Sequence, residues 1–173
     1  GETTQTISIN AGGNYNVTVT DANGCTAAKN FTLTEPTAIV AAVSATSIAC
    51  NGGTATVTVG AIGGVAPYTG TGTFSVTAGT YTYTVTDANG ATDASTITVT
   101  EPSAIVVTVT PGTITVFGGT TTVTVSATGG TGSYTYKLNT GSYQASNTFN
   151  NVAAGSHTIT VKDANGCTKS KSF

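Results

Sequence analysis

The stretch Tyr-Thr-Tyr-Thr-Val-Thr-Asp-Ala-Asn-Gly at residues 81–90 joins an alternating segment to a tight-turn signal. In a strand its aromatic and valine side chains would share one face and its threonines the other, the period-two pattern of a half-buried sheet. Asn-Gly accepts positive φ at low cost, so the last four residues predict a hairpin turn. Similar alternation precedes the same turn at 15–20 and 157–162. The local pattern therefore predicts antiparallel β structure.

The turn sequence Asp-Ala-Asn-Gly occurs three times, at 21–24, 87–90 and 163–166. The first two copies are 66 residues apart (87 − 21), and Glu-Pro and Gly-Gly pairs recur at the same offset. The third copy follows 76 residues after the second (163 − 87), so the last repeat has ten additional residues, which we place within 137–151. Such tandem repeats typically build length and surface rather than active sites.

The repeat divides the chain into the C-terminal part of one module at 1–36, a complete module at 37–102, and a module at 103–173 truncated in its last strand. Each complete module would hold about six or seven short strands, which predicts an all-β chain of tandem small immunoglobulin-like β-sandwich modules. A β-solenoid is the alternative architecture. Because both ends cut through a repeat, we expect a piece of a longer polypeptide, or a subunit completed by its neighbours.

Composition excludes two classes of partner. Charged residues make up 7% of the chain and the net charge is −2, so there is no basic stripe of the kind that binds nucleic acid. No apolar run approaches the roughly 18 residues of a membrane span, so we expect no membrane insertion.

The segments Ala-Gly-Thr-Tyr-Thr-Tyr-Thr-Val-Thr-Asp-Ala-Asn-Gly (78–90), Thr-Val-Thr-Glu-Pro (98–102) and Cys-Asn-Gly-Gly (50–53) together resemble the SprB-type repeat. Such repeats fill very large surface adhesins of gliding Bacteroidetes. The resemblance implies extracellular filaments, cell-surface adhesion and gliding motility, and it implies no catalytic residue. One departure is Ala91, which stands where such repeats commonly carry a cysteine.

The three cysteines lie at defined places in the repeat. Cys25 and Cys167 follow Asn-Gly, and Cys50 precedes Asn-Gly-Gly. At the 66-residue offset Cys25 corresponds to Ala91 and Cys50 to Val116. If the hairpin of one module pairs with the start of the next, Cys25 pairs with Cys50 and Ala91 pairs with Val116. Each pair then has two cysteines or none.

A chain reversal just after the Glu-Pro pair at 35–36 would bring Cys25 and Cys50 together. We therefore predict a disulfide between Cys25 and Cys50, with Cys167 free or bonded to another subunit; three buried thiols are the alternative. A disulfide implies an oxidising compartment.

Each Asp-Ala-Asn-Gly copy also resembles the start of an oxygen-rich calcium loop. A calcium loop of the EF-hand type needs more carboxylates and a distal glutamate, and none follows at that spacing. We favour a plain hairpin turn and predict no metal or other cofactor. The calcium alternative would use Asp21, Asn23, Asp87, Asn89, Asp163 and Asn165.

No set of residues predicts catalysis. His157 is the only histidine and aligns with Tyr15 and Tyr81, which indicates a packing position. Nucleophilic catalysis would need a partner base for a nucleophile, and none is spaced for it. Glu35 and Glu101 each precede proline at a module boundary, which is typical of a linker. We predict that the chain is not an enzyme and has no catalytic residues.

The favoured function is structural and adhesive: a segment or subunit of an extracellular surface filament or adhesin stalk, whose partners are neighbouring modules or copies of the same protein. The alternative is a carbohydrate-binding module. Tyr143 lies in the 137–151 insertion, which the middle repeat lacks, and an aromatic ring there could stack on a surface glycan.

Overall fold

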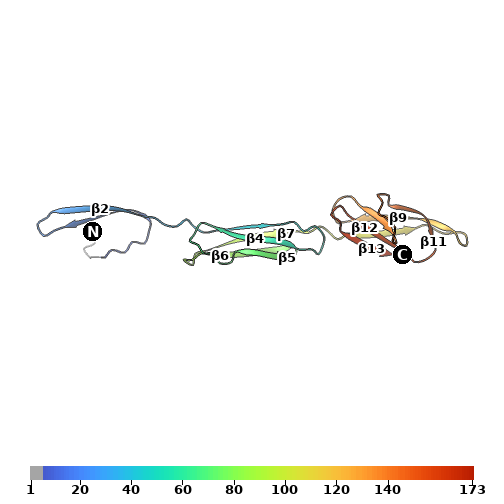
Figure 1. Cartoon of the computed structure of the whole chain (residues 1–173), viewed down its shortest axis with the longest axis horizontal. Coiled ribbons are helices and arrows are strands. Elements are labelled where there is room, and N and C mark those ends of the chain that lie inside the picture. Colours follow the sequence, from blue (N-terminus) through green and yellow to red (C-terminus); the bar gives the residue numbers. More distant parts are fainter. Residues whose placement is uncertain (1–5) are drawn as a thin grey trace.

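The computed structural model describes residues 6–173. These residues form thirteen β-strands and no helix, and every strand pairing is antiparallel. The sheets are small and the chain is extended: an N-terminal hairpin (13–33), a middle module (37–102) and a C-terminal module (103–173) follow one another in a row (Figure 1). The predicted all-β fold of sandwich-like modules is confirmed, and the solenoid alternative is not adopted.

The middle module consists of two facing sheets. One contains β3 (Val40–Ala45), β4 (Ala55–Ile62) and β5 (Gly72–Val76) in that order, and the other pairs β6 (Gly79–Thr86) with β7 (Thr92–Val99). The module therefore has five strands, fewer than the six or seven predicted.

Alternation along the strands builds the core of this module. Val57 and Val85, from opposite sheets, are fully buried, and threonines occupy the intervening positions on the outer faces. Burying a valine side chain stabilises a fold by about 2 kcal/mol. One apolar cluster joins both sheets; its buried members are Ile39, Ala41, Ile48, Ala55, Val57, Val59, Val85 and Val99.

The C-terminal module repeats this plan with one additional strand. Its two sheets have the orders β11-β9-β8 and β10-β12-β13. The strands are β8 (Val106–Pro111), β9 (Thr120–Thr128), β10 (Thr135–Leu138), β11 (Thr148–Ala153), β12 (Thr158–Lys162) and β13 (Thr168–Ser172).

Strand β10 of the C-terminal module corresponds to a single β-bridge in the middle module. Thr69 there pairs only with Thr86, whereas the equivalent Thr135 pairs with Lys162 and begins a four-residue ladder along β12. The offsets are 66 (135 − 69) and 76 (162 − 86), so the ten additional residues lie between these two partners. The 137–151 segment contains the end of β10 and the start of β11, and it thus extends one edge of the sandwich.

The N-terminal hairpin pairs β1 (Gly13–Thr20) with β2 (Thr26–Leu33). Tyr15 lies opposite Phe31 and their rings stack with centroids 5.7 Å apart. No three-stranded sheet covers this hairpin among the described residues.

Candidate functional site at the junction between modules

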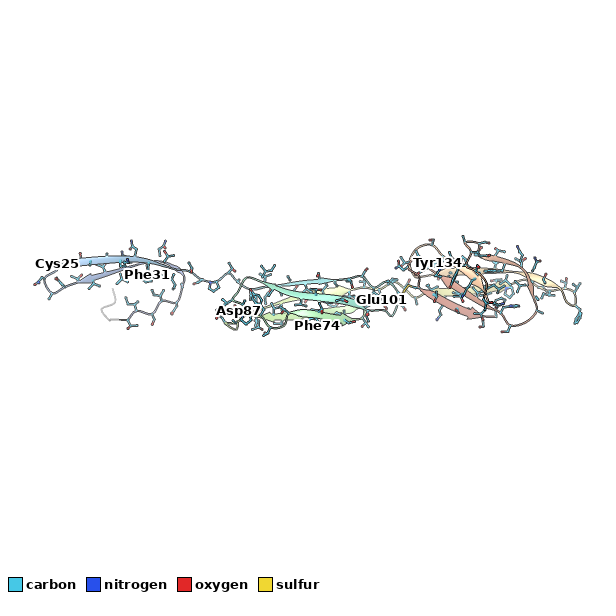
Figure 2. The ribbon with its side chains drawn as sticks, viewed as in Figure 1. Cys25, Phe31, Phe74, Asp87, Glu101 and Tyr134 are labelled. Atoms are coloured by element: carbon cyan, nitrogen blue, oxygen red, sulfur yellow. A yellow bond between two sulfur atoms is a disulfide. The ribbon has the colours of Figure 1, made fainter. Side chains whose placement is uncertain are left out.

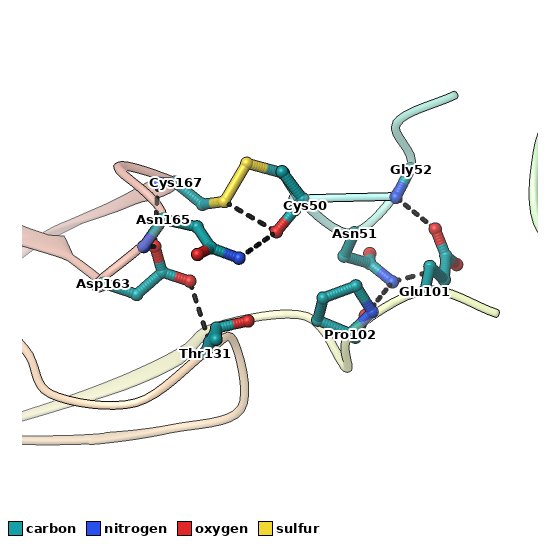
Figure 3. Close-up of a disulfide and its surroundings, with 10 residues drawn as sticks. Cys50, Asn51, Gly52, Glu101, Pro102, Thr131, Asp163, Asn165 and Cys167 are labelled. Atoms are coloured by element: carbon teal, nitrogen blue, oxygen red, sulfur yellow. Dashed lines mark hydrogen bonds between the residues drawn. A yellow bond between two sulfur atoms is a disulfide. The ribbon is translucent and has the colours of Figure 1, made fainter. Parts of the chain in front are cut away.

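A disulfide joins the middle module to the C-terminal module (Figure 3). Cys50 lies in the loop between β3 and β4, and Cys167 lies just after the turn between β12 and β13. The two cysteines are 117 residues apart. In the chain-entropy account, closing a loop of this length stabilises the folded state by about 5 kcal/mol.

The predicted Cys25–Cys50 pairing is wrong, because Cys50 bonds to Cys167 and Cys25 is an exposed free thiol. The prediction assumed that the chain reverses after the Glu-Pro pair at 35–36. Instead β2 runs toward the middle module and β3 continues in the same direction, so Cys25 lies at the far tip of the N-terminal hairpin (Figure 2). Each hairpin turn therefore lies at the same end of its module, and the loops after β3 and β8 lie at the opposite end.

Hydrogen bonds reinforce the disulfide on the side of the C-terminal module. The side-chain amide of Asn165 donates to the carbonyl oxygen of Ala49, with Nδ2 and O 3.0 Å apart. Asn165 belongs to the third Asp-Ala-Asn-Gly turn, so this turn contacts the neighbouring module beside the disulfide. The same turn in the N-terminal hairpin contains Asn23 and points away from the middle module.

A second set of bonds holds the linker itself. Asn51 Nδ2 lies 3.0 Å from Glu101 Oε1 and 3.1 Å from the carbonyl oxygen of Pro102, and the backbone N–H of Gly52 donates to Glu101 Oε2. Glu101 was expected to be a plain linker residue. Its carboxylate instead anchors the Cys50 loop to the segment that leads into the next module. The motif Cys-Asn-Gly-Gly contains the two donors, Asn51 and Gly52, but the sequence alone does not indicate that the Glu101 carboxylate accepts from them.

The aspartate of each turn binds backbone N–H groups. Asp163 Oδ1 accepts from Asn165 and Cys167, and its Oδ2 accepts from Thr131 of the neighbouring loop (2.9 Å). Asp163 is only 5% exposed. These bonds fix the turn that carries Cys167, and so they set the position of the sulfur.

Asp87 makes the same three bonds, to Asn89, Ala91 and Val65. In the N-terminal hairpin, Asp21 Oδ1 accepts from Asn23 and Cys25.

These contacts support the hairpin-turn interpretation over the calcium alternative. In the middle and C-terminal modules both oxygens of the turn aspartate already accept N–H bonds. Across residues 6–173, no group of three or more histidine, cysteine, aspartate or glutamate side chains could hold a metal ion. The six residues of the calcium alternative are thus divided among three separate turns.

Hydrogen bonding lowers the pKa of Asp87 below its ordinary value of 3.8. The largest cause is the N–H of Val65, and the N–H groups of Ala91, Asn89 and Gly90 add to it, while burial acts in the opposite direction. Because the pKa is lower in the folded state, the charged carboxylate stabilises the middle module at pH values above 3.8. That contribution is lost as the pH falls through the folded-state pKa.

We therefore expect the melting temperature of the middle module to fall as the pH is lowered from 5 to about 2, and Asp87→Asn to remove part of this dependence. Calorimetry at a series of pH values measures the effect. Asp21→Asn is the matched control, because Asp21 lies in the N-terminal hairpin and should leave the middle module unchanged. Equal acid dependence in Asp87→Asn and the unsubstituted chain would contradict the prediction.

His157 makes the contacts of the tyrosines with which it aligns. Its Nε2 donates to the carbonyl oxygen of Ala153, four residues earlier, at 3.0 Å. Tyr15 and Tyr81 likewise donate to carbonyls four residues earlier, at positions 11 and 77. His157 Nδ1 accepts from Asn139, and its ring packs on Phe173. Both ring nitrogens therefore have structural partners.

Tyr143 is half-buried beside two lysines. The Nζ atoms of Lys162 and Lys137 lie 4.1 Å and 5.2 Å from its ring centroid. Cation–π contacts of this kind hold the ring against two neighbouring strands of one sheet, the edge strand β10 and the central strand β12. Glycan binding by Tyr143 stays a prediction, and a sugar would have to stack on a ring that ammonium groups already contact.

No protein-family model matches the chain, and no curated protein matches it either. In the described part of the chain there is no helix with the length and apolar character needed to cross a membrane. The Cys50–Cys167 disulfide is compatible with an extracellular protein, since such bonds persist in oxidising compartments.

Proposed function

We propose that this chain is a segment of an extracellular surface filament or adhesin stalk built from tandem β-sandwich modules. The observation that supports this most directly is the junction, where a disulfide and the Asn165–Ala49 hydrogen bond join two successive modules and the Glu101 contacts fix the linker between them. Contacts of this kind give a row of small domains the stiffness that a stalk requires. The partners would be further modules or copies of the same protein.

The mechanism follows from the direction of the strands. Every Asp-Ala-Asn-Gly turn faces one end of the row, and the loops after β3 and β8 face the other end. Modules of this kind can therefore be added head to tail. The resemblance to SprB-type repeats extends the proposal to adhesion and gliding on the surface of a bacterium of the Bacteroidetes.

Immunogold electron microscopy of intact source cells tests this function. Antibodies raised against residues 1–173 are expected to label fibres on the cell surface, with repeated labels along each fibre. Antibodies against an established intracellular protein provide the matched control for cell integrity. Label confined to the cell interior, or to released protein without fibres, would contradict the proposal.

A further inference from the structure

The N-terminal hairpin exposes a face that the middle module buries. Val19 and Leu33 are 65% and 41% exposed, whereas their equivalents at the 66-residue offset, Val85 and Val99, are 0% and 5% exposed. Val17 and Phe31, on the same face of the hairpin, are exposed as well. The two hairpins have the same sequence pattern. They differ in exposure because a second sheet packs on the hairpin of the middle module and none packs on the N-terminal hairpin among the described residues.

The two hairpins also share their register. Gly13 lies opposite Leu33 in the first, and Gly79 lies opposite Val99 in the second. In the middle module this arrangement packs against the sheet β3-β4-β5. The N-terminal hairpin is therefore already shaped to pack on a sheet of that type.

The segment before the hairpin contains a counterpart of β5. Ile7-Ser8-Ile9 aligns with Phe74-Ser75-Val76 at an offset of 67 residues (74 − 7), since one additional residue precedes β1. In the middle module these residues pair with β4, but residues 7–9 form no strand. An apolar hollow of about 840 Å³ lies between this segment and the hairpin, lined by residues that include Ile7, Ile9, Tyr15, Val17, Val19 and Phe31.

We propose that the N-terminal hairpin and residues 7–9 form an acceptor site for a β-hairpin of the β3–β4 type. The incoming hairpin would pair its second strand with residues 7–9, as β4 pairs with β5, and place an alternating row of isoleucine, alanine and valine side chains on Val19 and Leu33. Strand addition of this kind supplies backbone hydrogen bonds for affinity and side-chain packing for selectivity. The occupant is thus a segment with the pattern of residues 37–62.

Within β1 and β2, Lys29 is the one charged residue on this face, and it is compatible with a covered sheet. It lies opposite Val17 in the register of the hairpin. In the C-terminal module the equivalent Lys171 lies opposite Ile159, which is fully buried in a complete core. A lysine at this place therefore coexists with a packed sandwich, because its long side chain can keep the ammonium group in water.

The first test adds a probe to the full chain. The probe is a peptide of residues 37–62 carrying Cys50→Ser, and binding is measured by calorimetry. We expect Val19→Asp to weaken binding at least about tenfold, because it places a charge in the apolar contact. Thr18→Asp is the matched control, since Thr18 lies on the opposite face of β1, and it should leave binding unchanged.

The second test supplies the incoming hairpin as part of the same chain. In a chain whose residues 1–4 are replaced by a copy of residues 37–71, amide hydrogen exchange of residues 7–9 and of β1 and β2 is expected to slow at least about 100-fold. Val19→Asp in the fused chain should remove this protection. Unchanged exchange in the fused chain would overturn the proposal, as would equal weakening of peptide binding by Val19→Asp and Thr18→Asp.

A second copy of the chain is the competing occupant. Self-association through the Val19 face that excess peptide does not displace would overturn the proposal. None of these outcomes touches the junction between the middle and C-terminal modules, so failure here is distinguishable from failure of the stalk function.

Discussion

Pulled from its two ends, the oxidised chain is expected to release about 400 Å less contour length on unfolding than the reduced chain. The Cys50–Cys167 bond spans a separation of 117 residues, and an extended chain covers about 3.5 Å per residue. Tension that enters through β3 crosses directly from Cys50 to Cys167 and leaves through β13. The residues between the two cysteines therefore carry no load while the bond is intact.

Single-molecule force spectroscopy with and without reductant measures this difference. The double variant Cys50→Ser/Cys167→Ser should extend like the reduced chain under both conditions. Cys25→Ser is the matched control and should behave like the unsubstituted chain, because Cys25 is free. Equal contour lengths for the oxidised and reduced chains would contradict the pairing. A limited extension under load is the property that a surface stalk needs.

Local sequence predicted the features that depend on neighbouring residues. Alternation placed Val85 and the tyrosines of β6 on one face and the threonines on the other, as the burial pattern of this strand confirms. The three Asp-Ala-Asn-Gly copies form hairpin turns for the reason expected: their glycines, such as Gly90, adopt positive φ. The turn aspartates were expected to serve these turns, and their carboxylates bind the backbone N–H groups that close them.

Features that depend on distant segments could not be predicted in the same way. The disulfide depends on whether the chain reverses after residues 35–36, and nothing in the local sequence fixes that direction. The contact between Glu101 and the Cys50 loop joins residues about fifty apart, and a glutamate before proline has the same local pattern whether or not it has such a partner. The strand number was overestimated because the segment between Gly63 and Gly70 forms turns and a single bridge rather than a strand.

The largest effect on stability is expected from substitution of Gly63 or Gly129, the first glycines of the Gly-Gly turns that follow β4 and β9. Gly129 has a φ of +77°, and a Cβ added to it would lie 2.0 Å from the carbonyl oxygen of Ala104. The backbone at Ala104 leads into β8, so it cannot move without disturbing the sheet. Positive φ costs an L-residue about 1–2 kcal/mol, and overpacking adds about 1–3 kcal/mol. Gly129→Ala should therefore destabilise the C-terminal module by about 3 kcal/mol or more.

The repeat supplies both the control and an independent replicate. Gly166 has a similar φ of +84° but open space around its added Cβ, so Gly166→Ala should cost only the roughly 1–2 kcal/mol of the backbone conformation. In the middle module, Gly63→Ala would meet the carbonyl oxygen of Ala38 at 2.2 Å, while Gly90→Ala meets nothing. Denaturant unfolding followed by tyrosine fluorescence should rank each clashing variant well below its open counterpart. Equal losses within both pairs would mean that the turn backbone can shift, and would contradict the close approach at these glycines.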